Sequence, residues 1–296
     1  MRPAGGAVTP EGPSAAPARA LTIGEVLRRS TAYLAERGSP SARLDAELLL
    51  GHALGVDRLR LYTDSERPLT PPELAAARGL VQRRGRREPV AYITGTRAFR
   101  RLALAVGPGV LVPRPETELL VEWALEAAPP GAAVLDWGTG SGAVALALAA
   151  EGERLRVTAL ERSASALEIA RGNGAACGLE VEWLASDGFA AVAGRRFAVI
   201  AANPPYLADA DLADATPELA HEPREALVAG PGGLEAVEGI CAAAAAHLHD
   251  GGWLLVEVGA GQAPAAAGLM ERAGLVGVAT RADLAGVARV VGGRRP

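Results

Sequence analysis

A regular alternation of short apolar runs and longer amphipathic stretches fills the chain from residue 132 almost to its C-terminus. Each apolar run has the length of a buried strand, and helix-like segments separate most of the runs. This order requires crossover connections, which build a mostly parallel sheet with helices on both faces. We therefore predict an α/β domain with strands at residues 133–136, 155–160, 181–185, 197–202, 253–258, 275–280 and 288–291, and with helices at 142–150, 234–248, 264–273 and one ending at 177.

The first part of the chain has a helical pattern instead. Thr22 with Glu25, and Thr70 with Glu73, form capping boxes in which side-chain oxygens satisfy the free N–H groups of a helix start. A further helix is expected to begin near Ser41. Glycines and prolines then separate β-like pieces at 90–94, 102–106 and 110–112. We predict four parts: a disordered lead-in (1–20), a small helical domain (21–88), a β-hairpin linker (89–115) and the sheet domain (116–296), which opens with a helix at 116–127.

Composition and charge narrow the classes of protein. A hydrophobic content of 49% with 22% charged residues is ordinary for a soluble globular protein, and no window approaches the roughly 18 apolar residues of a membrane span. Cys177 and Cys241 have no disulfide or metal spacing, so we expect a reduced, cytoplasmic protein without metal. Separately, we expect the protein to be a monomer. Residues 1–115 carry net charge +8 and residues 116–296 carry −12, which suggests that the first part faces an acidic or nucleic-acid-bearing partner.

A glycine-rich segment, Asp-Trp-Gly-Thr-Gly-Ser-Gly at 136–142, joins the first predicted strand of the sheet domain to its helix. Glycines let the backbone approach a ligand and leave helix N-terminal N–H groups free. The spacing also fits the dinucleotide fingerprint, with Glu161 as the acid that ends the next strand and binds ribose hydroxyls. The segment therefore predicts a nucleoside cofactor and leaves open whether this is a dinucleotide or S-adenosylmethionine. The candidate contacts in this segment are Gly138, Thr139, Gly140, Ser141 and Gly142.

The tetrapeptide Asn203-Pro204-Pro205-Tyr206 ends the apolar run 197–202, because two prolines permit neither further strand nor a helix start. An oxidoreductase has no need of it, whereas methylation of an amide nitrogen does. That nitrogen has a delocalised lone pair, so two acceptors must hold its hydrogens while the lone pair faces the methyl group. The Asn203 side-chain oxygen and the Pro204 carbonyl, stiffened by Pro205, are the candidate acceptors. Tyr206 is expected to lie against the planar group.

This tetrapeptide resembles that of amino-methyltransferases that use S-adenosylmethionine. Its flanks are similar to one family among them, the protein-glutamine methyltransferases that modify peptide-chain release factors. The similar segments are 43–50, 89–95 with Phe99, 111–118, 222–227, 232–234 and 283–289.

The resemblance implies methyl transfer from S-adenosylmethionine to N5 of the glutamine in the Gly-Gly-Gln motif of class-I release factors. It implies a seven-stranded, Rossmann-like methyltransferase sheet, with the helical domain docking the release factor. Asp187 is then expected beside the adenine amine, with Gly188 next to it and Asn203 also near the cofactor. Phe99 and Arg114 are expected at the substrate together with the tetrapeptide, of which Asn203, Pro204 and Tyr206 are the catalytic candidates.

Several alternatives remain. An adenine-N6 nucleic-acid methyltransferase shares the tetrapeptide, but the acidic second part argues against nucleic-acid binding. A ribosomal-protein glutamine methyltransferase differs in the linker at 114–117, and a nicotinamide oxidoreductase accounts only for the glycine segment. The family usually has aromatic residues where this chain has Arg100 and Gly188, which keeps a catalytically silent docking module open. Glu257, at the end of a predicted strand, is expected to be structural.

Overall fold

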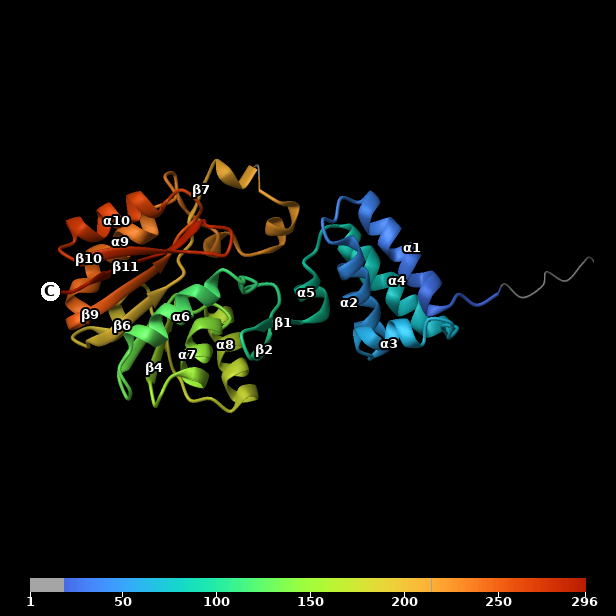
Figure 1. Cartoon of the computed structure of the whole chain (residues 1–296), viewed down its shortest axis with the longest axis horizontal. Helices are drawn as coiled ribbons and strands as arrows, with labels where there is room; N and C mark the ends of the chain where they lie inside the picture. The colour runs from blue at the N-terminus through green and yellow to red at the C-terminus, as the bar shows by residue number, and fades with distance from the viewer. Residues whose placement is uncertain (1–18, 214) are drawn as a thin grey trace, which may run out of the picture. The chain divides into compact units, whose positions relative to one another are not determined.

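The computed structural model describes residues 19–213 and 215–296, so the predicted disordered lead-in lies almost wholly outside the described residues. The chain divides into two compact units, one ending at Arg86 and one spanning Arg87–Pro296 (Figure 1). Within the described residues, no helix has both the length and the apolar character that crossing a membrane requires.

The first unit consists of helices, as predicted. The capping boxes at Thr22 and Thr70 both form: each threonine side chain accepts from the backbone N–H of the glutamate three residues later, and that glutamate accepts from the threonine N–H. The short third helix was missed by sequence reasoning; the side chain of Asp57 caps its N-terminus. The helices are α1 (Ile23–Glu36), α2 (Ala42–Leu54), α3 (Arg58–Thr63) and α4 (Pro71–Gly85).

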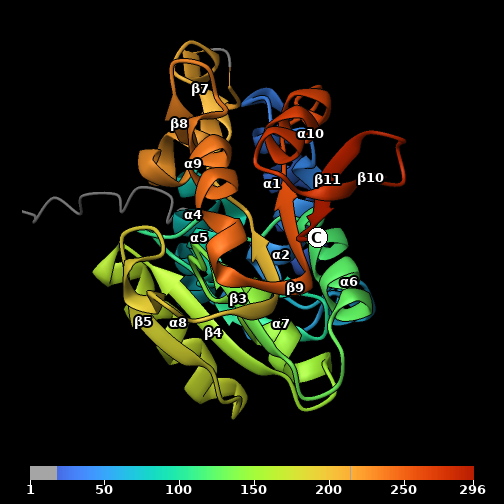
Figure 2. The same cartoon turned by 90° about the vertical axis from the view of Figure 1, so that its left-hand side faces the viewer.

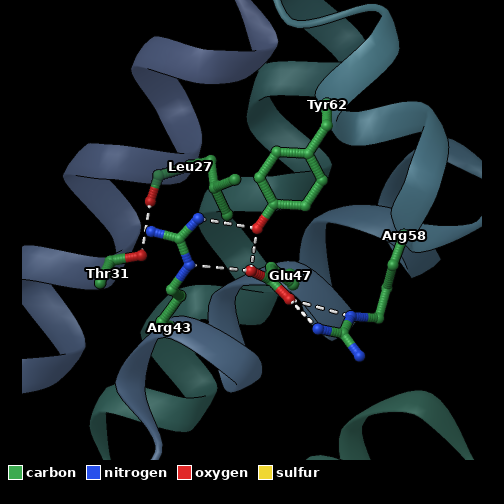
Figure 3. A network of polar contacts seen from close by, with 6 residues as sticks. All are labelled: Leu27, Thr31, Arg43, Glu47, Arg58 and Tyr62. Atoms are coloured by element: carbon green, nitrogen blue, oxygen red, sulfur yellow. Dashed lines mark hydrogen bonds and ion pairs between the residues drawn. The ribbon is translucent and has the colours of Figure 1, made fainter.

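Buried carboxylates connect these helices. The Asp45 carboxylate of α2 accepts a hydrogen bond from Nε of Arg84, a residue of α4, at 2.7 Å. Glu47, also on α2, is the centre of the network in Figure 3: Arg43 (3.1 Å), Arg58 (2.9 Å) and the Tyr62 hydroxyl all donate to its carboxylate. Burial raises the pKa of Glu47, but the hydrogen bonds from Tyr62 and Arg58 outweigh burial and hold that pKa below its ordinary value.

The second unit is built on a seven-stranded sheet in the order β10-β11-β9-β6-β3-β4-β5, which confirms the predicted α/β fold. Neighbouring strands from β9 to β5 pair in parallel, and β11 pairs antiparallel with both β9 and β10. The strands are β3 (Ala133–Trp137), β4 (Arg156–Glu161), β5 (Glu182–Ala185), β6 (Phe197–Ala202), β9 (Leu248–Glu257), β10 (Val276–Ala282) and β11 (Ala288–Arg294).

Helices cover both faces of this sheet (Figure 2). Successive strand residues point to opposite faces. Val134 of β3 therefore joins a core cluster with α6 and α7, whereas Leu135 joins a cluster with α9 and α10. The helices are α6 (Thr117–Ala127), α7 (Ala143–Glu151), α8 (Ala164–Cys177), α9 (Glu235–Ala244) and α10 (Ala263–Arg272).

The segment before α6 differs in part from its prediction. The expected hairpin forms from β1 (Thr96–Phe99) and β2 (Leu102–Ala105). Residues 90–94 were expected to be β-like, but they form the short helix α5 (Val90–Thr94). Tertiary packing overrides their β propensity, because Tyr92 is buried and its hydroxyl donates to the Val110 carbonyl at 2.5 Å. Residues 110–112 form no strand, and Val112 N–H instead donates to the Glu222 carboxylate.

Two further boundaries were predicted wrongly. Leu248 was assigned to the end of a helix, but it is the first residue of β9, beside Phe197 of β6. A register shift between the two strands lies just beyond this pair, so β9 begins well before the apolar run that marked it in the sequence.

Candidate active site

A cavity of about 580 Å³ lies where the central strands of the sheet end. Each of four neighbouring strands contributes a polar side chain there: Asp136 from β3, Glu161 from β4, Asp187 after β5 and Asn203 after β6. The carboxyl ends of parallel strands share one edge, which is where open α/β sheets bind ligands. Nine of the predicted site residues line the cavity: Gly138, Thr139, Gly140, Ser141, Glu161, Asp187, Gly188, Asn203 and Pro205.

The glycine segment between β3 and α7 is shaped by its backbone angles. Gly138, Gly140 and Gly142 have φ values of 73°, 55° and 87°, which favour glycine. Gly142 does not line the cavity; a Cβ at this position would lie 3.1 Å from Trp183, so the glycine permits close packing at the start of α7.

The Asp136 carboxylate connects the glycine segment to the start of α7 through hydrogen bonds. Its Oδ2 accepts hydrogen bonds from the Thr139 hydroxyl (2.6 Å) and from Ala145 N–H (3.0 Å) in the first turn of α7. Burial raises the pKa of Asp136 to about 7, and the charge of Glu161 acts in the same direction, against those two hydrogen bonds.

Glu161 is held by backbone groups from two segments. One carboxylate oxygen accepts from Gly140 N–H and the other from Ser163 N–H, each at 2.9 Å. Each oxygen keeps a second lone pair, so the fixed carboxylate can accept from two neighbouring hydroxyl groups, as on a ribose. This donor and acceptor set therefore fits the nucleoside part of S-adenosylmethionine.

The wall beyond β5 contains an aromatic residue that sequence reasoning missed. Phe189 lines the cavity directly after Gly188, and its ring stacks on His247 at 4.7 Å with an interplanar angle of 8°. The resemblance predicted an aromatic side chain at position 188, where this chain has glycine. The aromatic residue at the next position, Phe189, was the signal in the sequence that could have identified this wall. Phe189 offers an apolar wall that suits a planar base.

The Asn203 corner has an unusual hydrogen-bonding pattern. Asn203 Nδ2 donates to the Thr117 hydroxyl at 3.1 Å, while its Oδ1 is buried and has no hydrogen-bond partner among the described residues. Pro204 is buried, and the Tyr206 carbonyl accepts from the Gln262 side chain at 2.8 Å. Burial raises the pKa of Tyr206, so its hydroxyl stays neutral. Thr117 lines the cavity and was not among the predicted site residues.

Two predicted substrate residues lie elsewhere in this unit. Phe99 is 1% exposed and belongs to the hydrophobic core. Arg114 forms an ion pair with Glu222 at 2.5 Å. Neither lines the cavity, and neither do Pro204 and Tyr206.

Comparisons with known proteins show the family to which the chain is similar. Residues 25–95 match the family model of the PrmC N-terminal domain, and residues 115–238 match the methyltransferase small domain. The release factor glutamine methyltransferase of Geobacter sulfurreducens is 46% identical over 274 residues, which cover 92% of this chain and 96% of that relative. The enzyme of the same name from Burkholderia pseudomallei is 45% identical, with 88% of this chain and 94% of the relative covered.

Solved structures show the same fold. A methyltransferase from Pyrococcus furiosus has a TM-score of 0.51 at 19% identity, covering 67% of this chain and 91% of that one. A 16S rRNA methyltransferase of T. thermophilus, solved with AdoMet and guanosine, has a TM-score of 0.50 at 21% identity, covering 68% and 50%. The two release factor glutamine methyltransferases are 45–46% identical to this chain over almost their whole length. The chain therefore belongs to the family of release factor glutamine methyltransferases.

Proposed function

We propose that this chain transfers a methyl group from S-adenosylmethionine to the side-chain amide nitrogen of a glutamine, the one in the Gly-Gly-Gln motif of class-I release factors. One observation carries the reaction type: Asn203 Oδ1 is a buried acceptor without a partner among the described residues, on a side chain that lines the cavity. An unpaired buried acceptor costs about 1–3 kcal/mol, which an incoming amide N–H offsets. The names of the relatives support the release factor as substrate.

The residues act mainly by positioning. When bound, S-adenosylmethionine supplies a methyl group on a positively charged sulfur. Glu161 holds the ribose hydroxyls, and the Asp136 carboxylate keeps the glycine segment in place. Asn203 Oδ1 and the Pro204 carbonyl accept the two amide hydrogens, so that the nitrogen lone pair faces the methyl carbon. The C–S bond breaks as the N–C bond forms, and the product nitrogen then releases a proton to water. Orienting two reactants in this way lowers the barrier by roughly 7–11 kcal/mol.

The remaining expectations belong to the same proposal. The helical unit docks the release factor, and its excess of arginine favours an acidic partner. Arg114, with its ion pair to Glu222, fixes the loop that precedes α6 rather than touching the substrate directly, and Phe99 belongs to the core cluster that also contains Leu120 of α6. The protein acts in the cytoplasm as a monomer and does not bind nucleic acid directly.

The test uses S-adenosylmethionine labelled in its methyl group. The purified chain is incubated with a release factor and with the same factor carrying alanine in place of the Gly-Gly-Gln glutamine. Label in the first factor alone is the expected result, and the Asn203→Ala variant should lose most of the transfer, with a slow residual rate, while still binding S-adenosylmethionine. Label in both factors, or only in added DNA, RNA or ribosomal protein, would contradict the proposal.

A further inference from the structure

Thr117 and Glu257 lie beside the catalytic asparagine although they are far from it in sequence. Thr117 is the first residue of α6, and Glu257 is the last residue of β9. Ala202 pairs with Val256 across β6 and β9, so the next residues, Asn203 and Glu257, come off the same edge of the sheet. Both Thr117 and Glu257 are buried.

The chemistry of the three side chains fixes the direction of their hydrogen bonds. Asn203 Nδ2 can only donate, so the Thr117 oxygen, 3.1 Å away, accepts from it. The single hydroxyl hydrogen of Thr117 is then left for another acceptor, and the Glu257 carboxyl, whose pKa the Thr117 hydroxyl lowers, is the neighbouring group that can take it. An ionised carboxylate can only accept, so it requires this direction.

We propose that Thr117 and Glu257 are positioning residues, which hold the Asn203 amide with its nitrogen toward Thr117 and its oxygen unpaired for the substrate. This inference rests on the proposed function. Without the hydroxyl, the Asn203 amide can rotate by half a turn and present its NH2 group to the substrate. Two donors would then face each other, and the glutamine nitrogen would lose the acceptor that aligns it.

The protonation of Glu257 should control this arrangement. Burial raises the pKa of Glu257 to about 7; Glu116 also raises it, while the Thr117 hydrogen bond, Arg289 and Arg114 lower it. Tyr206, which is half-buried, is a further titratable group near this carboxyl, since the charge of Glu257 adds to the burial that raises the pKa of Tyr206. A protonated Glu257 can donate to the Thr117 oxygen, and the Thr117 hydroxyl can then donate to Asn203 Oδ1. The reversed chain occupies the oxygen that the substrate needs, so methyl transfer should increase as pH rises through about 7.

The test compares Thr117→Val, which removes the hydroxyl at similar volume, with Thr117→Ser, which keeps it. We expect kcat to fall about 10-fold to 100-fold in Thr117→Val, with little change in the KM for the release factor, and to stay within about 3-fold of wild type in Thr117→Ser. Calorimetric titration with S-adenosylmethionine, expected to give unchanged affinity, verifies that Thr117→Val is folded. Equal kcat in the valine variant and wild type, or equal losses in the valine and serine variants, would overturn the inference.

Two further measurements separate positioning from a structural role. In an Asn203→Ala background, Thr117→Val should cause no additional loss, because the group that it positions is gone. The rise of kcat through about pH 7, measured at saturating S-adenosylmethionine, should be absent in Glu257→Gln; an unchanged pH profile would overturn the role of Glu257. Failure of the wild-type chain to methylate any release factor would contradict the proposed function itself, whereas active wild type with active Thr117→Val contradicts only this inference.

Discussion

Removing the charge of Asp45 should destabilise the helical unit selectively. Its carboxylate accepts hydrogen bonds from Arg84 Nε (2.7 Å) and from the hydroxyls of Ser39 (2.6 Å) and Ser41 (2.8 Å), so each of its two oxygens has a donor. In Asp45→Asn, an NH2 group must face one of these donors, and the Arg84 guanidinium loses its ion pair with Asp45. The side chains of Arg84 and Asp45 are only 5% and 6% exposed, so water does not replace the lost interaction.

The expected cost follows from this burial. Removing one partner of a buried ion pair costs about 3–5 kcal/mol, which is a large part of the 5–15 kcal/mol that typically stabilises a domain. For a unit of this size each kcal/mol lowers the melting temperature by roughly 4–8 °C, so the helical unit should melt at least about 12 °C lower.

The assay is thermal unfolding of the full-length chain by circular dichroism, with hydrogen exchange to localise the loss to α2 and α4. Asp64→Asn is the matched control, because its ion pair with Arg60 at 3.7 Å is exposed (39% and 65%) and should contribute less than about 0.5 kcal/mol. Combining Asp45→Asn with Arg84→Met should recover part of the stability, since the buried charge that Asp45 compensates is then removed as well. A loss for Asp45→Asn as small as that of the control would refute the reasoning.

Three other perturbations test the second unit. Arg100, at φ 49° in the turn between β1 and β2, donates to both carboxylate oxygens of Glu151 (2.7 and 2.8 Å). Arg100→Ala should lower the free energy of unfolding, measured in urea, by about 1–2 kcal/mol. Glu151→Ala should lower it little further in the Arg100→Ala background, because the pair is already lost. The raised pKa of Asp136, about 7 against an ordinary 3.8, means that the folded state keeps a proton which the unfolded chain loses between about pH 4 and 7. Stability from Asp136 is therefore present below that window and declines as pH rises through it, and Asp136→Asn should lack the decline. Glu161→Gln should weaken S-adenosylmethionine binding about 10-fold or more in calorimetry, because one amide hydrogen must face Gly140 or Ser163 N–H.

Much of the fold could be predicted because its signals are local. Apolar runs and capping boxes depend on residues close together in the sequence. Both capping boxes form, and each apolar run of the sheet domain lies within or overlaps a strand. The β prediction for residues 90–94 was wrong because their structure depends on a distant contact, the hydrogen bond of the buried Tyr92 to the Val110 carbonyl, which a local pattern does not contain. The helix α3 was missed because it is short and leaves Leu59 71% exposed, so it has little amphipathic signal.

The cofactor end of the site was also accessible to sequence reasoning, since its residues follow strands directly. Gly140 and Glu161 were expected at this edge of the sheet, and a hydrogen bond joins them. Thr117 was not expected at the site, because it lies 86 residues before Asn203 and looks like an ordinary first residue of a helix. Arg100 looked like a loss of an aromatic contact, but its pairing with Glu151 gives the substitution a structural reason.

The two ends of the site differ in how their polar atoms are satisfied. Asp136 and Glu161, toward the cofactor, accept hydrogen bonds from the backbone, so this end is rigid before any ligand binds. Among the described residues, the buried side-chain polar atoms without a partner are Trp137 Nε1, Asn203 Oδ1 and Glu257 Oε2. All three lie at the ends of adjacent strands, β3, β6 and β9. Each costs about 1–3 kcal/mol, and a fold tolerates such violations mainly where function requires them. The position of these unpaired atoms therefore favours Asn203 and its neighbours as the place where a polar substrate group enters.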